Sequence, residues 1–133
     1  MNRVFADSYF FFAILNPRDA AHAKAMDFGR RHRGPLVTTA WVLTEVADGL
    51  ASTPRRQVFR GLLANLEVNK NNLIVPANSE TFEKGVELYH ARPDKQWSLT
   101  DCTSFVVMSE ERITEALSGD RHFEQAGFTA LRK

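Results

Sequence analysis

The sequence contains one cysteine, no long apolar run and no cluster of cysteine and histidine. Cys102 is the single cysteine among 133 residues, so an internal disulfide is excluded, and the lack of a CxxC or Cys/His motif removes the common zinc sites. These features favour a reducing, cytoplasmic environment. Asp7 interrupts the apolar start of the chain, and no stretch approaches the ~20 apolar residues of a membrane-spanning helix. We therefore expect no association with a membrane.

The sequence also lacks a strong excess of charge, a flexible linker and an internal repeat. Its formal net charge is +1 and its isoelectric point is about 8.0, below the value of ~9 that marks strongly basic nucleic-acid-binding domains. Charge alone therefore identifies no partner. Hydrophobic residues make up 44% and charged residues 25% of the chain, which is the composition of folded proteins and not of disordered ones. Because no composition break interrupts the chain, we expect one domain over residues 1–133.

Short β-rich segments alternate with longer segments of helical periodicity. The expected strands cover residues 4–6, 36–38, 73–75, 113–117 and 128–131. The expected helices cover residues 9–15, 19–31, 40–50 and 55–68, followed by one that begins near residue 79, one that begins between residues 98 and 101 and ends at 108 or 109, and a short one at 121–126. Strands that alternate with helices imply βαβ crossovers and a mainly parallel sheet. We predict an α/β fold with three layers, α/β/α.

The polar residues that follow the expected strands are mostly acidic. Ligands bind beyond the carboxyl ends of the strands in such sheets, so these positions matter most. Asp7 follows the first strand, Asp120 follows the fourth, and Asp101 opens a helix that should begin near the same edge. Glu45 lies in the expected helix 40–50 on the side opposite its apolar residues, so we expect it to face solvent or a cleft.

Each acid also has a purely structural explanation. Asp7 and Asp120 are good N-cap residues for the helices that follow them, and the segment SLTD at residues 98–101 fits a capping box. Several carboxylates at one sheet edge nevertheless repel one another unless a cation neutralises them. Carboxylate oxygens are ligands that suit Mg²⁺ or Mn²⁺. The acids taken together therefore favour a metal site.

Four segments of the chain resemble the PIN-domain nucleases, a family that includes the VapC toxins of toxin–antitoxin pairs. The segments are, in family order, VFADS at 4–8, TEV at 44–46, WSLTDCTSF at 97–105 and SGDRHF at 118–123. Together they span nearly the whole chain, and the last two are the most specific. Ser118 is a minor departure from the family pattern, because threonine is common at that position. Ser8 fits the pattern, since threonine or serine often follows the first aspartate.

The resemblance implies a Rossmann-like three-layer fold and a metal-dependent endoribonuclease. The acids that it implies as metal-binding and catalytic residues are Asp7, Glu45, Asp101 and Asp120. Mg²⁺ or Mn²⁺ held by such acids orients a water for attack on an RNA phosphodiester, and no protein nucleophile is required. The toxin of a type II toxin–antitoxin pair is the leading interpretation, which admits an antitoxin protein and a second copy of the chain as partners.

Other polar residues near these segments are candidates for supporting roles. Ser104 lies one helical turn after Asp101, where its hydroxyl can orient the acid or a metal-bound water. The remaining candidates for support are Ser8, Thr100 and His122. Arg121 and Lys95 are the candidates for contact with the RNA substrate.

Three alternative interpretations remain open at this point. The chain is also compatible with a stand-alone RNA-processing nuclease of the same family, and a PIN-like RNA-binding module without catalysis is a further alternative. A signalling receiver domain shares the length and the α/β alternation. Receivers need an acidic pair after the first strand and an acid after the third, but the segment VPAN at residues 75–78 contains no acid. The receiver interpretation is therefore the weakest.

Overall fold

The computed structural model describes residues 2–32, 34–119 and 121–131 and contains a parallel β-sheet of five strands in the order β3-β2-β1-β4-β5. The strands are β1 (Val4–Ala6), β2 (Leu36–Thr39), β3 (Leu73–Val75), β4 (Glu115–Leu117) and β5 (Thr129–Ala130). The central strand β1 pairs with β2 through Phe5 and Val37 and with β4 through Phe5 and Ala116. The carboxyl ends of these three strands therefore meet at one edge.

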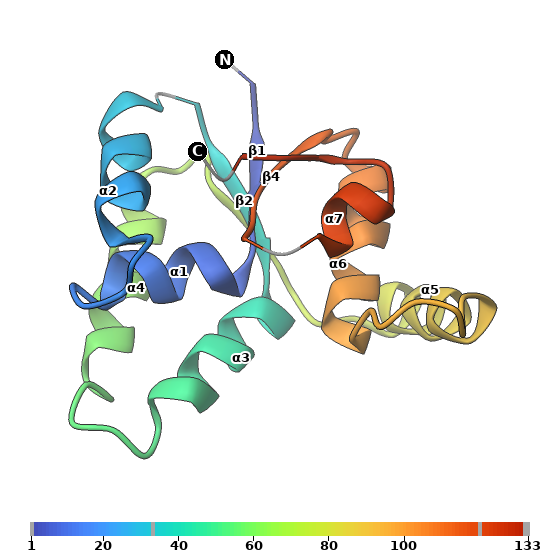
Figure 1. Cartoon of the computed structure of the whole chain (residues 1–133), viewed down its shortest axis with the longest axis horizontal. Coiled ribbons are helices and arrows are strands. Elements are labelled where there is room, and N and C mark those ends of the chain that lie inside the picture. Colours follow the sequence, from blue (N-terminus) through green and yellow to red (C-terminus); the bar gives the residue numbers. More distant parts are fainter. Residues whose placement is uncertain (1, 33, 120, 132–133) are drawn as a thin grey trace.

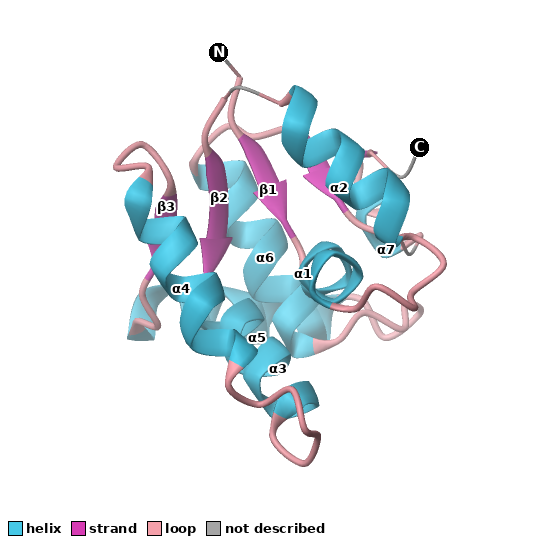
Figure 2. Cartoon of the chain, turned by 90° about the vertical axis from the view of Figure 1, so that its left-hand side faces the viewer, coloured by secondary structure: helices cyan, strands magenta, loops and turns pink. Residues whose placement is uncertain are grey.

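Helices cover both faces of the sheet. They are α1 (Ser8–Leu15), α2 (His22–Arg31), α3 (Ala40–Leu50), α4 (Val58–Val68), α5 (Ser79–Ala91), α6 (Leu99–Glu110) and α7 (His122–Gln125). Figure 1 shows α1, α2 and α4 on one side of the strands and α5, α6 and α7 on the other. The view turned by 90° shows the same layering, with α1, α2 and α4 in front of the strands and α6 behind them (Figure 2). The predicted three-layer α/β/α fold is confirmed.

Helix α3 links the two layers at the carboxyl edge of the sheet, because it packs against both α1 and α6. Its N-cap Thr39 accepts a hydrogen bond from the backbone N–H of Val42 at 3.1 Å, which fixes the start of the helix directly after β2. Val46 is buried on the inner side, whereas Glu45 is exposed. The predicted bounds and orientation of this helix are confirmed.

Several predicted element boundaries were wrong, and local hydrogen bonds explain why. Helix α2 begins at residue 22 and not at 19, because the Asp19 carboxylate accepts the backbone N–H of Ala21 at 2.8 Å and forms a turn. Helix α4 begins at residue 58 and not at 55, because the Thr53 hydroxyl accepts the N–H of Arg55 at 3.1 Å.

Other predicted boundaries differ by one or two residues. Strand β4 begins at residue 115 because α6 ends in a left-handed residue, Arg112 (φ 58°), and the Ile113 N–H is bonded to the Met108 carbonyl at 2.8 Å. Strand β5 is shorter than predicted because Phe128 N–H is bonded back to the Phe123 carbonyl at 2.9 Å. The last helix, α7, is also shorter than the predicted 121–126.

Aromatic side chains pack together with aliphatic ones in the core around β1. Phe5 and Phe11 are fully buried, and Phe123 lies 6.1 Å from Phe5 between ring centroids. Phe105 packs edge-to-face on Phe123 at 5.0 Å and on Trp97 at 5.0 Å. These contacts hold α6, α7 and the segment before α6 in fixed relative positions. No helix in the described ranges is long and apolar enough to cross a membrane.

Candidate active site

Asp7 lies directly after β1, at the carboxyl edge of the sheet, and is 4% exposed. It occupies the N-cap position of α1, but its side chain makes no capping hydrogen bond there. Its Oδ2 instead accepts a hydrogen bond of 3.0 Å from the Ser118 hydroxyl, which follows β4. Capping therefore does not account for this buried carboxylate, and the bond joins the ends of two neighbouring strands.

Asp101 lies in the first turn of α6 and is 8% exposed. The predicted capping box is confirmed, because Asp101 Oδ2 accepts the Ser98 backbone N–H at 3.0 Å and the Ser98 hydroxyl accepts the Asp101 N–H at 3.0 Å. The same Oδ2 lies 2.9 Å from Nδ1 of His122. The structural explanation of Asp101 is thus correct. Because these bonds use Oδ2, the other carboxylate oxygen, Oδ1, can bind a further ligand.

Two neighbours of Asp101 define the chemistry around it. Ser104, one turn later on α6, is fully buried, and its hydroxyl has no hydrogen-bond partner among the described residues. A buried hydroxyl of this kind requires a partner to offset its desolvation.

Burial, together with the negative charge of Asp101, raises the pKa of the Cys102 thiol to about 11. The thiol is therefore protonated at neutral pH.

The two other predicted acids are Glu45 and Asp120. Glu45 is exposed on α3, and Asp120 lies outside the described residues. Within residues 2–32, 34–119 and 121–131, no group of three or more histidine, cysteine or acidic side chains stands close enough to hold a metal. The described part of the chain therefore places Asp7 and Asp101 at the carboxyl edge of the sheet, and it does not bring Glu45 into a metal-binding cluster with them.

The donor types present fit a hard divalent cation. Two buried carboxylates, Asp7 and Asp101, and the unpartnered hydroxyl of Ser104 are all oxygen donors. Such donors suit Mg²⁺ or Mn²⁺, whereas structural zinc sites use thiolate and imidazole. The other two predicted supporting residues, Ser8 and Thr100, are half-buried at the first turns of α1 and α6.

A hollow of about 690 Å³ reaches His122, whose ring contacts Asp101 at 2.9 Å. It is lined by Asp94, Lys95, Gln96, Gly119, Arg121, His122 and Gln125. The two predicted RNA-contact residues, Lys95 and Arg121, therefore share one concave surface, and His122 joins that surface to Asp101. Sequence reasoning missed Gln96 and Gln125, because isolated glutamines carry no spacing signal.

One acid on the rim of this hollow is already neutralised. Arg92 donates two hydrogen bonds to the Asp94 carboxylate, at 3.0 Å and 2.9 Å. The Arg92 guanidinium lowers the pKa of Asp94 to about 2, so the pair is fully charged at neutral pH. Among the described residues that line the hollow, the lysine and arginine side chains are those of Lys95 and Arg121.

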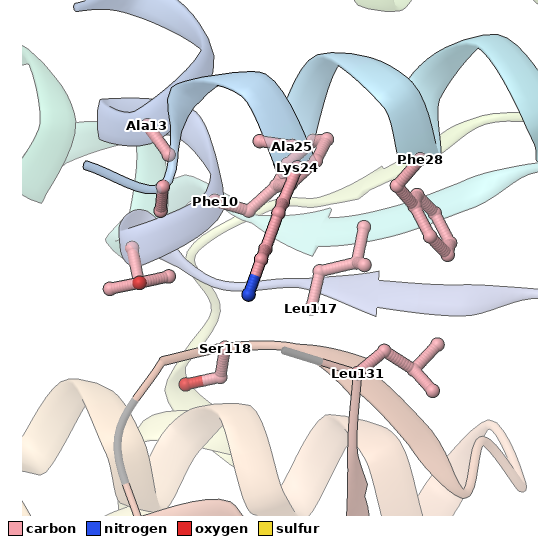
Figure 3. A pocket seen from close by; sticks show the side chains of 10 residues that line it. Phe10, Ala13, Lys24, Ala25, Phe28, Leu117, Ser118 and Leu131 are labelled. Atoms are coloured by element: carbon pink, nitrogen blue, oxygen red, sulfur yellow. The ribbon is translucent and has the colours of Figure 1, made fainter. Parts of the chain in front are cut away.

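A second, smaller pocket lies between α1, α2 and the end of β4. Figure 3 shows Phe10, Ala25 and Phe28 on its helical side and the Lys24 side chain extending from α2 toward the segment that carries Ser118. Its volume of about 30 Å³ holds a water and not a nucleotide. The larger hollow is therefore the candidate for substrate.

A parallel α/β/α fold with buried carboxylates at the carboxyl edge of its sheet is the architecture of the PIN domain. The PIN domain family model matches residues 4–129, and the chain belongs to this family. The predicted resemblance is confirmed.

Particular relatives cover nearly the whole chain. The "23S rRNA-specific endonuclease VapC20" of Mycobacterium tuberculosis, in strains CDC 1551 and H37Rv, is 29% identical over 133 residues, 97% of this chain and 98% of the relative. The crystal structure of M. tuberculosis VapC20, described as a Sarcin-Ricin loop cleaving toxin, superposes with a TM-score of 0.87 at 24% identity and covers 98% of this chain and 99% of that one. The FitAcB structure from Neisseria gonorrhoeae has a TM-score of 0.70 at 12% identity, with 96% of each chain covered.

Proposed function

We propose that the protein is a metal-dependent endoribonuclease, the toxin of a type II toxin–antitoxin pair. The observation that carries this proposal is the pair of buried carboxylates, Asp7 and Asp101, at the carboxyl edge of a PIN-domain sheet. A relative that matches almost the full chain bears the name of an RNA endonuclease. Ribosomal RNA, the substrate in that relative's name, is the substrate class that we propose.

We propose Asp7, Glu45, Asp101 and Asp120 as the residues that hold Mg²⁺ or Mn²⁺. When bound, the cation supplies positive charge that stabilises the phosphate in the transition state and lowers the pKa of the attacking water. The chain's own part is to position the oxygens that bind it. The Ser118 hydroxyl orients the Asp7 carboxylate through its 3.0 Å hydrogen bond.

The supporting residues act on Asp101 and on the substrate. His122 holds one carboxylate oxygen of Asp101 at 2.9 Å, which restricts the rotation of that side chain. We propose the buried Ser104 hydroxyl, with Ser8 and Thr100, as further oxygen donors near the acids. Lys95 and Arg121 line the adjacent hollow, where their charges neutralise the phosphates on either side of the cleaved bond.

The experiment is cleavage of purified ribosomes and of total RNA, with Mg²⁺, Mn²⁺ or EDTA, followed by mapping of the new 5′ ends. We expect discrete cleavage sites in ribosomal RNA that are lost in EDTA and in the Asp101→Asn variant. Tight RNA binding without any cleavage would instead support an RNA-binding module. Cleavage that persists in EDTA would contradict the metal-dependent mechanism.

We also propose two protein partners. A toxin must be held inactive in the cell that makes it, so an antitoxin is the first, and co-expression with an adjacent small reading frame tests it.

A second copy of the chain is the other proposed partner. Phe82 and Tyr89 lie seven residues apart on one side of α5 and are 44% and 48% exposed, which leaves an apolar stripe suited to a symmetric helix contact. Light scattering after Phe82→Glu, with a fall from dimer to monomer mass, is the measurement.

A further inference from the structure

The hollow that reaches His122 contains two uncharged amides besides its cationic residues. Lys95 and Arg121 can neutralise phosphates, and such backbone contacts position an RNA without reading its bases. Gln96 and Gln125 line the same surface, and an amide forms directional hydrogen bonds with base edges. The glutamines therefore add a capacity to distinguish bases that phosphate contacts do not supply.

Gln125 has a fixed orientation, which the indole of Trp97 sets. Trp97 Nε1 donates a hydrogen bond of 3.1 Å to Gln125 Oε1. An indole N–H only donates, so the amide must turn its oxygen toward Trp97 and its NH₂ group away. Trp97 is itself immobilised, because it is 7% exposed, packs on Phe105 at 5.0 Å and has the Arg92 guanidinium 5.4 Å from its ring centroid. Gln125 thus presents a rigid hydrogen-bond donor.

Gln125 also stands at a fixed separation from the candidate catalytic acids. It lies three residues after His122 on α7, so the two side chains project from the same side of that helix, about one turn apart. His122 contacts Asp101 at 2.9 Å, and both His122 and Gln125 line the hollow. A nucleotide next to the cleaved phosphate therefore has room to lie with its base at Gln125.

We propose that this hollow receives a nucleotide that flanks the cleaved bond and that Gln125 selects a base with a keto group, guanine or uracil, over one with an amino group, adenine or cytosine. The inference rests on the nuclease function proposed above. The outward NH₂ of Gln125 pairs with guanine O6 or uracil O4, whereas it meets another donor in the amino group of adenine or cytosine. Trp97 acts as a positioning residue for this selection.

The test uses a pool of random single-stranded RNA 12-mers. The pool is cleaved with Mn²⁺, and the base at each position beside the cut is counted by sequencing. In parallel, the same pool is retained on the full-length protein in EDTA and the retained RNAs are sequenced. For the wild type we expect keto bases to be favoured about fivefold at one position next to the cut, the value of a single neutral hydrogen bond, and to be enriched among the retained RNAs.

Three variants separate an effect on base selection from an effect on the stability of the protein. Gln125→Ala should abolish the keto preference, and Gln125→Glu, whose second oxygen accepts hydrogen bonds, should reverse it in favour of adenine and cytosine. Trp97→Phe keeps the ring but removes the N–H, so cleavage should continue with a weakened base preference. Gln57→Ala, an exposed glutamine that precedes α4 on the opposite face of the sheet, is the matched control and should leave the preference unchanged.

The outcomes distinguish this inference from the proposed function. Cleavage without any base preference beside the cut, or a preference that survives Gln125→Ala, would overturn the role of Gln125 and leave the nuclease intact. Absence of cleavage combined with a Gln125-dependent enrichment of keto bases among the retained RNAs would overturn the nuclease and support the base selection. Melting curves of each variant confirm that the compared proteins are folded.

Discussion

Asp101 combines a structural role with a proposed chemical one, and a pair of substitutions separates the two. Ser98→Ala removes the hydroxyl that accepts the Asp101 N–H at 3.0 Å, but it leaves the carboxylate in place. Asp101→Asn removes the negative charge while an amide oxygen can still accept the Ser98 N–H. Both changes weaken the same helix cap, but only the second alters the proposed metal ligand.

The expected losses of stability are similar for the two variants. Loss of a serine N-cap costs about 1 kcal/mol of unfolding free energy. In Asp101→Asn the bonds to Ser98 and His122 change from charge-assisted to neutral, which costs about 1–2 kcal/mol, and the removal of charge repulsion with Asp7 offsets part of that cost. Each variant should therefore melt about 4 °C below the wild type, with nearly all molecules still folded at 25 °C.

The expected losses of activity differ. Ser98→Ala should cleave RNA at close to the wild-type rate, whereas the cleavage rate of Asp101→Asn should fall at least about 100-fold. Substitution of residues that only hydrogen-bond to metal ligands already lowers activity or metal affinity about 10–100-fold. Initial rates at 25 °C on one RNA, beside urea unfolding curves, provide the comparison. Near wild-type cleavage by folded Asp101→Asn would refute the metal-ligand assignment. Equal rate losses in both variants would show that Asp101 acts only through the helix cap.

Three further outcomes follow from the same geometry. Millimolar Mn²⁺ should raise the melting temperature of the wild type as RT ln(1 + [L]/Kd) predicts, and Asp7→Asn should remove that rise. The logarithm of RNA affinity should fall linearly with the logarithm of salt concentration, and Lys95→Ala or Arg121→Ala should each reduce the slope by about one. Gly85→Ala should destabilise the protein by about 1–3 kcal/mol, because a Cβ at Gly85 would lie 2.6 Å from Cγ2 of Thr103 where α5 packs on α6.

Matched controls make these three measurements specific. Asp48→Asn changes an exposed acid on α3 and should leave the Mn²⁺ shift intact. Lys70→Ala, an exposed cation near β3, should not alter the salt slope. Gly61→Ala places a Cβ with no atom within 4 Å and should stabilise α4 slightly, as alanine does in an open helix. A Gly85→Ala protein as stable as the wild type would contradict the close packing of α5 on α6.

Local patterns in the sequence predicted most of the fold. Two features, the bounds of α3 and the capping box that begins α6, depend on residues that lie within four positions of one another. Periodicity and capping chemistry are therefore enough to predict them. The starts of α2 and α4 were predicted three residues too early. There, the side chains of Asp19 and Thr53 accept hydrogen bonds from nearby backbone N–H groups, and each helix begins after the turn that this bond forms. Residue type alone does not decide whether such a turn or the first turn of a helix forms.

The sequence predicted that Asp7 and Asp101 lie at one edge of the sheet, but it did not predict the long-range contacts around them. Asp7 and Asp101 stand at the ends of recognisable elements, so the topology of a parallel sheet indicates their common edge. The Ser118 to Asp7 bond joins residues 111 positions apart, and Trp97 meets Gln125 across 28 positions. Such pairs follow from packing in three dimensions and leave no periodic trace in the chain.

The place of β1 between β2 and β4 makes the surroundings of Asp7 depend on a segment that is synthesised much later than Asp7 itself. Glu115–Leu117 form the neighbouring strand, and Ser118 orients the Asp7 carboxylate. A nascent chain that has not yet reached residue 118 therefore contains this acid without the strand and the hydroxyl that position it. In this architecture the proposed nuclease site is assembled only after β4 has been translated.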